Sequence, residues 1–234
     1  MPTAPRSVAD ALAGYFVNRA THGGTTAAVT AALREAILDG ALLPEDWLRE
    51  DELARIFSVS RTPVREALSH LVDEGLARKA VHLGTVVSTL TLEDVLALYV
   101  VREDLEGLAA RLAADRATPQ LLVELDAIGQ QMKAAAEKSD ADRLARLNLD
   151  WHGRLRAAAS NTYLDRFLGQ VEQAVRRLPI STFAEPDRAR AVLAEHEAVV
   201  DAIRAGDGEA AQSAARQHMR RAREARLAKL LHSR

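Results

Sequence analysis

Residues 59–65 read Val59-Ser-Arg-Thr-Pro-Val-Arg65 and open a short amphipathic helix. Ser60 is a residue type that caps helices by accepting a backbone N–H, and Pro63 falls in the first turn, where its missing N–H costs nothing. Arg61 and Arg65 share one face, four residues apart. The opposite face is an apolar stripe of Val64, Leu68 and Leu71. Such a helix can pack on a core with one face and enter a DNA major groove with the other.

Two helical patterns precede this helix. Residues 27–38 carry apolar side chains at helical spacing and end at Asp39-Gly40. Residues 50–57 form a second, shorter pattern, and only Ser58-Val59 separates it from the helix after it. Two short helices joined so tightly predict a helix-turn-helix.

A small β-hairpin is expected after these helices. Residues 76–79 and 85–88 have strand-like patterns, and the turn between them contains Gly84. We therefore predict a winged helix-turn-helix over residues 27–90. Residues 1–26 form an N-terminal arm, for which an expression remnant, a disordered segment and an extra packing helix are all open readings.

The charge of the predicted winged region argues weakly against nucleic-acid binding. The chain has a formal net charge of −2, and residues 27–90 hold seven Lys/Arg and ten Asp/Glu. A positive field would have to be local, on the helix face and the wing. We assign DNA contact to the residues of these surfaces, namely Arg49, Ser60, Arg61, Thr62, Pro63, Arg65, Arg78, Lys79 and Gly84.

Residues 91–234 are expected to be helical throughout. Thr91-Leu-Glu-Asp94 resembles a capping box, and further starts are marked by cap residues or first-turn prolines. These starts lie at Thr118-Pro119, Ser139-Asp140, Asn161, Glu185-Pro186 and Asp207. The fold class is thus mainly α, with an N-terminal winged helix-turn-helix and a C-terminal six-helix antiparallel bundle.

Three histidines are expected to point into the bundle. His152 borders an apolar stripe together with Asn148, one turn earlier. His196 lies between Val192 and Val199, and His218 continues a row of alanines on the last helix. Residues from facing helices can jointly hold a metal inside a bundle. For any one histidine alone, a hydrogen bond within the core is the simpler interpretation.

Several ordered blocks resemble the GntR superfamily of bacterial transcription regulators. The blocks in the winged region begin at Ala32, Leu48, Val59 and Glu74. Beyond the wing, further blocks are similar to the FCD ligand-binding domain of the FadR-like group. They are Val101-Arg-Glu-Asp-Leu-Glu106, Trp151-His152 with Asn161, and Glu195-His196 with Gly206-Asp207. The resemblance covers roughly residues 27–232.

This resemblance implies a metal site formed by Asn148, His152, His196 and His218. The family pattern usually has aspartate four residues before the first histidine, where this chain has Asn148. Asparagine offers a neutral carbonyl oxygen, so the site should hold a divalent ion less tightly. Zinc is the first choice, with nickel or manganese as alternatives.

Arg102 is the second candidate for ligand binding. It shares a helical face with apolar residues, where a guanidinium is costly unless something pairs with it. One interpretation is an internal salt bridge to Glu106 at i+4. The other is a fork for an effector carboxylate beside the metal, because the resemblance favours organic-acid effectors.

Composition is compatible with an intracellular regulator. The chain has no cysteine, which excludes disulfides and thiolate metal sites. No apolar run approaches the ~18 residues that span a bilayer, so a cytoplasmic location without membrane contact is expected.

We expect a homodimeric transcription regulator, acting as a repressor on a palindromic operator in double-stranded DNA and sensing a small carboxylate. One alternative is a metal-dependent hydrolase-like enzyme, although no HExxH and no obvious general base are present. The other is a DNA-binding dimer with purely structural histidines.

Overall fold

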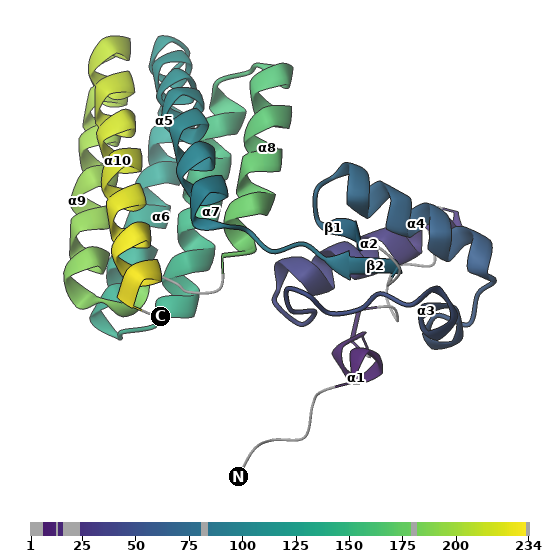
Figure 1. The fold of residues 1–234 in the computed structure, drawn as a ribbon. Helices are drawn as coiled ribbons and strands as arrows, with labels where there is room; N and C mark the ends of the chain where they lie inside the picture. The colour runs from purple at the N-terminus through teal and green to yellow at the C-terminus, as the bar shows by residue number, and fades with distance from the viewer. Residues whose placement is uncertain (1–6, 13, 16–23, 81–83, 179–181, 233–234) are drawn as a thin grey trace. The chain divides into compact units, whose positions relative to one another are not determined.

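The computed structural model describes residues 7–12, 14–15, 24–80, 84–178 and 182–232. It divides into two compact units, Met1–Leu90 and Thr91–Arg234, and each is described by itself. Among the described residues the molecule is mainly helical, with one two-stranded antiparallel sheet (Figure 1). This confirms the predicted fold class.

The first unit is a winged helix-turn-helix. Ser58, with a φ of 54°, lies in the short turn that redirects the chain between the two helices of the motif. Ser60 is the N-cap residue of the second of them, but its side chain makes no cap hydrogen bond, so the expected capping contact is wrong. The elements are α1 (Val8–Leu12), α2 (Thr25–Leu38), α3 (Glu50–Ile56), α4 (Arg61–Asp73), β1 (Ala77–Ala80) and β2 (Gly84–Val87).

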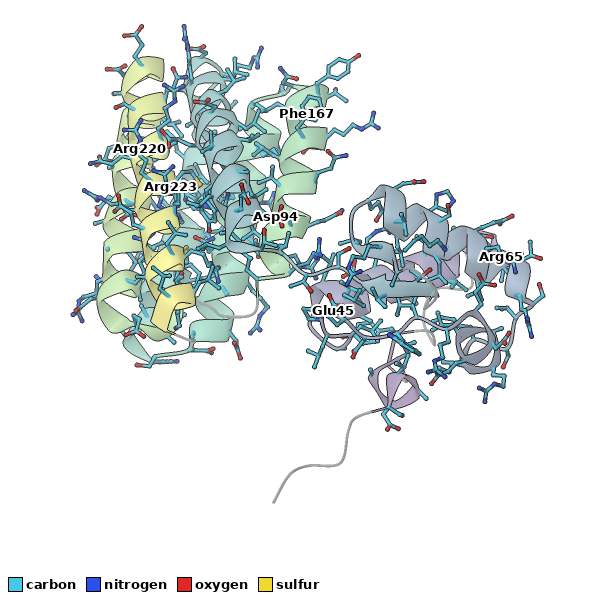
Figure 2. The ribbon with its side chains drawn as sticks, in the orientation of Figure 1. Glu45, Arg65, Asp94, Phe167, Arg220 and Arg223 are labelled. Carbon is cyan, nitrogen blue, oxygen red and sulfur yellow. The ribbon has the colours of Figure 1, made fainter. Side chains whose placement is uncertain are left out.

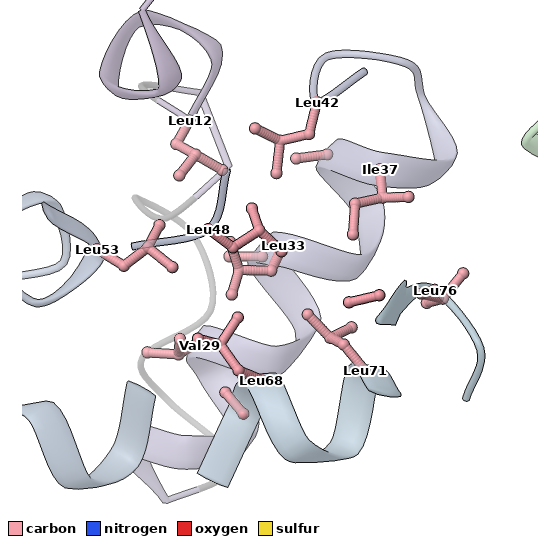
Figure 3. Close-up of a cluster of buried hydrophobic side chains, with 14 of the residues drawn as sticks. Leu12, Val29, Leu33, Ile37, Leu42, Leu48, Leu53, Leu68, Leu71 and Leu76 are labelled. Carbon is pink, nitrogen blue, oxygen red and sulfur yellow. The ribbon is translucent and has the colours of Figure 1, made fainter. Parts of the chain in front are cut away.

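The three main helices of this unit converge on one apolar core. Leu33 of α2, Leu53 of α3 and Leu68 of α4 are fully buried in it (Figure 3). Helix α1 contributes Leu12, which is 1% exposed. A fully buried leucine stabilises a fold by about 1.5–3 kcal/mol. Residues 8–12 are therefore a packing helix, which is one of the three readings left open for the arm.

The wing is the antiparallel pair β1–β2, with Ala77 opposite Val87 and Ala80 opposite Gly84. Both strands are shifted by one residue toward the turn relative to the predicted ranges 76–79 and 85–88, because Ala80 and Gly84 also pair. Trp47 forms an isolated bridge with Val86, so the segment before α3 lies along the outer side of β2. The wing is thereby attached to the start of α3.

The second unit is the predicted six-helix bundle (Figure 1). Its helix starts agree with the cap residues, since Thr91 and Asp94 form a reciprocal capping box and Asn161 accepts from two backbone N–H groups. The long join holds one short 3-10 turn, Thr182–Ala184. The helices are α5 (Leu92–Asp115), α6 (Pro119–Glu137), α7 (Ala141–Ala158), α8 (Thr162–Arg176), α9 (Pro186–Arg204) and α10 (Gly208–His232).

Small residues let α5 and α10 approach closely. A Cβ atom added at Gly107 would lie 2.9 Å from Cγ of Arg216 on α10, so a larger residue there would have to displace this side chain. Ala110 and Ala113 of α5 are fully buried on the same side of the bundle core. No helix in the described part of the chain is long and apolar enough to cross a membrane.

Candidate metal centre and DNA-binding surface

Three buried histidines meet at the centre of the bundle. His152 comes from α7, His196 from α9 and His218 from α10, and each is at most 7% exposed. The Nε2 atom of His218 lies 3.3 Å from Nε2 of His152 and 3.3 Å from Nε2 of His196. The three candidate ligand atoms all lie within 4.8 Å of one another. The predicted convergence of these side chains is therefore present in the structure.

Two carboxylates fix the tautomers of two of these rings. Nδ1 of His152 lies 3.1 Å from Oε2 of Glu106, and Nδ1 of His218 lies 2.6 Å from Oε2 of Glu195. An ionised carboxylate can only accept, so each Nδ1 donates, and in the neutral ring, which is the form that binds a metal, Nε2 then presents a lone pair. In that form two lone pairs face each other across 3.3 Å. A cation between them removes the repulsion.

Both carboxylates are charged despite their burial. Burial opposes ionisation of Glu106, but the charge and hydrogen bond of His152 and the charge of Arg102 outweigh it and lower its pKa to about 2. Burial also opposes ionisation of Glu195, but hydrogen bonds from His218 and Arg188 outweigh it and lower the pKa of Glu195. The centre thus combines three imidazole rings with two fixed negative charges, which favours a divalent cation.

The spacing of the nitrogens fits a tetrahedral ion. Imidazole nitrogens bound at about 2.0–2.1 Å in tetrahedral geometry lie about 3.3–3.4 Å apart. Two of the observed separations equal this value. On α7, one turn before His152, Oδ1 of Asn148 is buried and has no hydrogen-bond partner in the part of the chain that the structure describes. A buried carbonyl oxygen of this kind is an acceptor that lacks a donor or a cation.

His196 differs from the other two rings. Its Nδ1 atom is buried without a hydrogen-bond partner among the described residues, and its face stacks on Trp151 with ring centroids 3.8 Å apart. Burial, followed by the charges of His218 and His152, lowers the pKa of His196 well below 6.5. A neutral imidazole is the form that binds a metal. His196 is thus positioned by aromatic packing instead of a carboxylate.

Arg102 forms an internal salt bridge to Glu106, which is one of the two roles predicted for this residue. Its Nε atom lies 3.3 Å from Oε1 of Glu106, and its guanidinium lies 5.6 Å from the ring of Tyr99. Glu106 therefore links Arg102 to His152 through its two oxygens. The cavity beside this group, which Arg156 and Glu172 also line, holds only about 10 Å³, the space of one water molecule.

A larger cavity lies on the other side of the histidine cluster. It has a volume of about 230 Å³ and is lined by His196 and Trp151 together with residues of α6 and α9. Its charged residues include Lys133 and Arg204, and Arg204 is paired with Asp126 at 3.0 Å. This space is large enough for a small organic acid, whereas the cavity at Arg102 is not.

Sequence reasoning missed the carboxylates that orient the histidines. The prediction linked Glu106 only to Arg102 and gave Glu195 no role. Helical spacing places Glu195 on the apolar face of α9, three residues after Val192 and four before Val199. Glu195 is 5% exposed, and Arg188 donates to it at 2.7 Å. The available signal was the adjacent pair Glu195-His196 on a helix that is buried on more than one side.

The buried histidines predict a pH-dependent stability of the metal-free protein. Burial outweighs the hydrogen bond to Glu195 and lowers the pKa of His218 from 6.5 to about 4. Between these values the unfolded chain binds more protons than the folded one, so stability falls as the pH falls from 6.5 to 4.

We expect the free energy of unfolding, measured by urea titration of chelator-treated protein, to drop over this range, with roughly 3 kcal/mol of the drop due to His218. His218→Gln should remove that part of the dependence, while His196, whose pKa is also lowered by burial, should keep its own part. An identical pH profile in that variant would contradict the assignment.

The DNA-binding residues predicted on α4 lie on its exposed start. Arg61, Thr62 and Arg65 are exposed, while Pro63 is half-buried. Each arginine pairs with a carboxylate at the start of α3. Nε of Arg61 lies 2.5 Å from Oδ1 of Asp51, and Nη2 of Arg65 donates to Glu50 Oε2 at 2.9 Å. Figure 2 labels Arg65 on this side of the unit.

The remaining predicted contacts lie at the wing and at the start of α3. The guanidinium of Arg49 lies 4.6 Å above the ring of Trp47. Arg78 pairs with Glu45 at 2.6 Å, and Lys79 donates to the hydroxyl of Thr85 at 3.0 Å. Gly84 is exposed, with a φ of 93°, at the first position of β2.

A winged helix-turn-helix joined to a helical bundle with a buried polar centre defines a ligand-responsive DNA-binding regulator. Family comparison agrees, because residues 25–87 match the family of bacterial regulatory proteins called gntR and residues 97–221 match the FCD domain. The chain belongs to the GntR family and carries an FCD domain. It is a transcription regulator and not an enzyme, so the hydrolase-like alternative is wrong.

Similar proteins are regulators as well. The HTH-type transcriptional regulator YdhC of Bacillus subtilis (strain 168) is 30% identical over 181 residues, which are 77% of this chain and 81% of that protein. A probable D-xylose utilization operon transcriptional repressor of Paenarthrobacter nicotinovorans is 34% identical over 175 residues, 74% of this chain and 75% of its own length. A GntR regulator structure from Rhodococcus sp. RHA1 has the same fold, with a TM-score of 0.69, 24% identity, and coverage of 88% of this chain and 99% of that one.

Proposed function

We propose that this chain is a cytoplasmic repressor that binds a palindromic operator as a homodimer and responds to a small carboxylate effector bound next to a metal ion. The observation that carries the proposal is the combination, in one chain, of exposed arginines at the start of α4 and three buried histidines with converging Nε2 atoms. The first surface provides DNA recognition, and the second provides a place for a regulatory ligand.

For DNA recognition, α4 enters the major groove with its N-terminal turn. Arg61 and Arg65 are long, exposed donors suited to the O6 and N7 atoms of guanine. Thr62 and Arg49 contact phosphate, as do the wing residues Arg78 and Lys79. Phosphate contacts set affinity and register but carry no sequence information. These residues therefore divide into those that determine specificity and those that determine affinity.

The test is the effect of two substitutions on operator selectivity. Arg61→Ala should cost about 1–3 kcal/mol on the operator selected from random DNA and much less on scrambled DNA, because a bidentate guanine contact is lost. Arg49→Ala should weaken binding to both duplexes to a similar degree. Fluorescence anisotropy with both duplexes at several salt concentrations measures the two effects. Unchanged selectivity in Arg61→Ala would overturn the assigned role.

The metal is held by the nitrogens of His152, His196 and His218, with Asn148 as the neutral fourth ligand. Zinc fits best, because two of the nitrogen separations match tetrahedral coordination, and nickel or manganese are the alternatives. Glu106 and Glu195 orient two of the rings. A bound ion of this kind supplies a Lewis-acid position for a carboxylate oxygen.

The effector is a small carboxylate that replaces Glu106 as the ion-pair partner of Arg102. Arg102 is 6% exposed and its guanidinium already pairs with a carboxylate, so its site has the right chemistry for the carboxylate of an effector. Because the adjoining cavity has room for only one water molecule, the effector must displace side chains around Arg102. This displacement would separate two states of the bundle with different operator affinities.

The dimer forms through the outer faces of α5 and α8. These helices pack together through Ala109, Leu164 and Leu168, which are buried. Next to this contact, four large apolar side chains are exposed, and Figure 2 labels one of them on α8. They are Val101, Leu108, Tyr163 and Phe167. A second copy would bury this apolar face and bring two recognition helices onto one operator.

A further inference from the structure

The start of α3 places two carboxylates against the arginines that we assign to base recognition. Asp51 pairs with Arg61 at 2.5 Å, and Glu50 accepts from both Nε and Nη2 of Arg65, at 3.2 and 2.9 Å. Both arginine side chains remain about two thirds exposed, so the pairs lie on the surface that faces DNA. The hydrogen bond from Arg65 lowers the pKa of Glu50, which keeps it ionised at neutral pH.

These ion pairs have an energetic consequence for DNA binding. Before an arginine can bind DNA, it must leave its carboxylate or share it. A phosphate of non-operator DNA offers the guanidinium little more stabilisation than the carboxylate does. The phosphate also lies close to the negative charge of that carboxylate, which repels it. A guanine edge offers two aligned acceptors without a formal charge. The exchange is therefore more favourable at the correct base than at any phosphate.

We infer that Glu50 and Asp51 are specificity-determining residues, whose carboxylates hold Arg65 and Arg61 and thereby weaken binding to non-operator DNA. The inference rests on the proposed role of these two arginines. It accounts for two of the ten acidic residues of a DNA-binding region that has only seven basic ones.

The experiment uses the full-length chain with the selected operator and a scrambled duplex of the same composition. Asp51→Asn and Glu50→Gln remove the charges with little change in shape. Since an exposed ion pair is worth up to about a fivefold change in an equilibrium constant, each variant should bind scrambled DNA up to about fivefold more tightly. Operator affinity should rise less, so the ratio between the two affinities falls.

Two further measurements separate this role from a general effect of charge. Asp73→Asn is the matched control, because Asp73 is exposed at the far end of α4 and its removal changes the charge of the unit equally. It should leave the selectivity ratio unchanged. In Asp51→Asn, the slope of log affinity against log salt on scrambled DNA should become steeper by about one, since the freed arginine contacts a phosphate.

A double-mutant cycle makes the inference falsifiable. In the Arg61→Ala background, Asp51→Asn should tighten binding to scrambled DNA much less than it does in the natural chain, because no arginine is freed and only the loss of one negative charge remains. A full effect in that background, or an equal effect from Asp73→Asn, would overturn the inference. If Arg61→Ala alone leaves operator selectivity intact, the proposed recognition role fails instead, so the two failures are distinguishable.

Discussion

Replacing His196 by alanine is expected to abolish metal binding and effector response together, while the metal-free protein keeps its affinity for the operator. His196 supplies one of three converging nitrogens, and Nε2 of His218 lies only 3.3 Å from it. Loss of a residue that merely orients a ligand costs about 10–100-fold in metal affinity, so loss of a ligand should cost at least about a hundredfold. Elemental analysis of protein purified without chelator, followed by metal titration, measures this loss.

Matched variants make this result interpretable. Because alanine leaves a space beside Trp151, His196→Gln serves as a second variant of closer volume. His70→Ala, at an exposed histidine of α4, is the control for histidine removal. Asn148→Asp should bind metal more tightly than the natural protein, since it adds a negative charge to the ligand set. If it does not, Asn148 is not a ligand.

Arg102→Gln separates the effector site from the metal site. It should retain the metal but lose the change in operator affinity that small organic acids cause in the metal-loaded protein. A substoichiometric metal content of the natural protein, with an unimpaired acid response in His196→Ala, would contradict the linked mechanism. The histidines would then be core residues.

Much of this site could be predicted because it depends on helix periodicity. His152, His196 and His218 each fall on an apolar face, and side chains on the inner faces of a bundle must converge. The cap residues Thr91 and Asn161 likewise mark helix starts through local hydrogen bonds that need no distant partner. Local patterns therefore gave the helices, their order and the residues in the centre.

The contacts that could not be predicted depend on how helices cross. Glu195 points to His218 because α9 is covered by α10 as well as by its other neighbours. Asp51 meets Arg61 because the tight turn at Ser58 brings the start of α3 beside the start of α4. Charged residues of this kind have the same sequence pattern as solvated ones. Only the packing of the elements shows which of them are paired.

Replacing Phe167 by glutamate is expected to convert the proposed dimer into a monomer and to lower operator affinity by at least about a hundredfold. The side chain is 50% exposed on α8, next to the contact with α5. In the proposed dimer, two symmetric copies of the substitution would bury two unpaired charges, each of which costs several kcal/mol. A monomer presents a single recognition helix, which covers only one half-site. Light scattering and anisotropy titration at matched concentrations measure the two effects.

Val123→Glu is the matched control, because Val123 is 63% exposed on α6 and lies outside the α5–α8 face. It should leave both the molecular mass and the operator affinity unchanged. Phe167→Leu keeps an apolar side chain and should remain dimeric, so the loss can be attributed to the charge. If Phe167→Glu stays dimeric, the α5–α8 face is not the interface. If the Phe167→Glu variant is monomeric but binds the palindromic operator with undiminished affinity, dimerisation does not contribute to operator affinity, because one recognition helix is then sufficient.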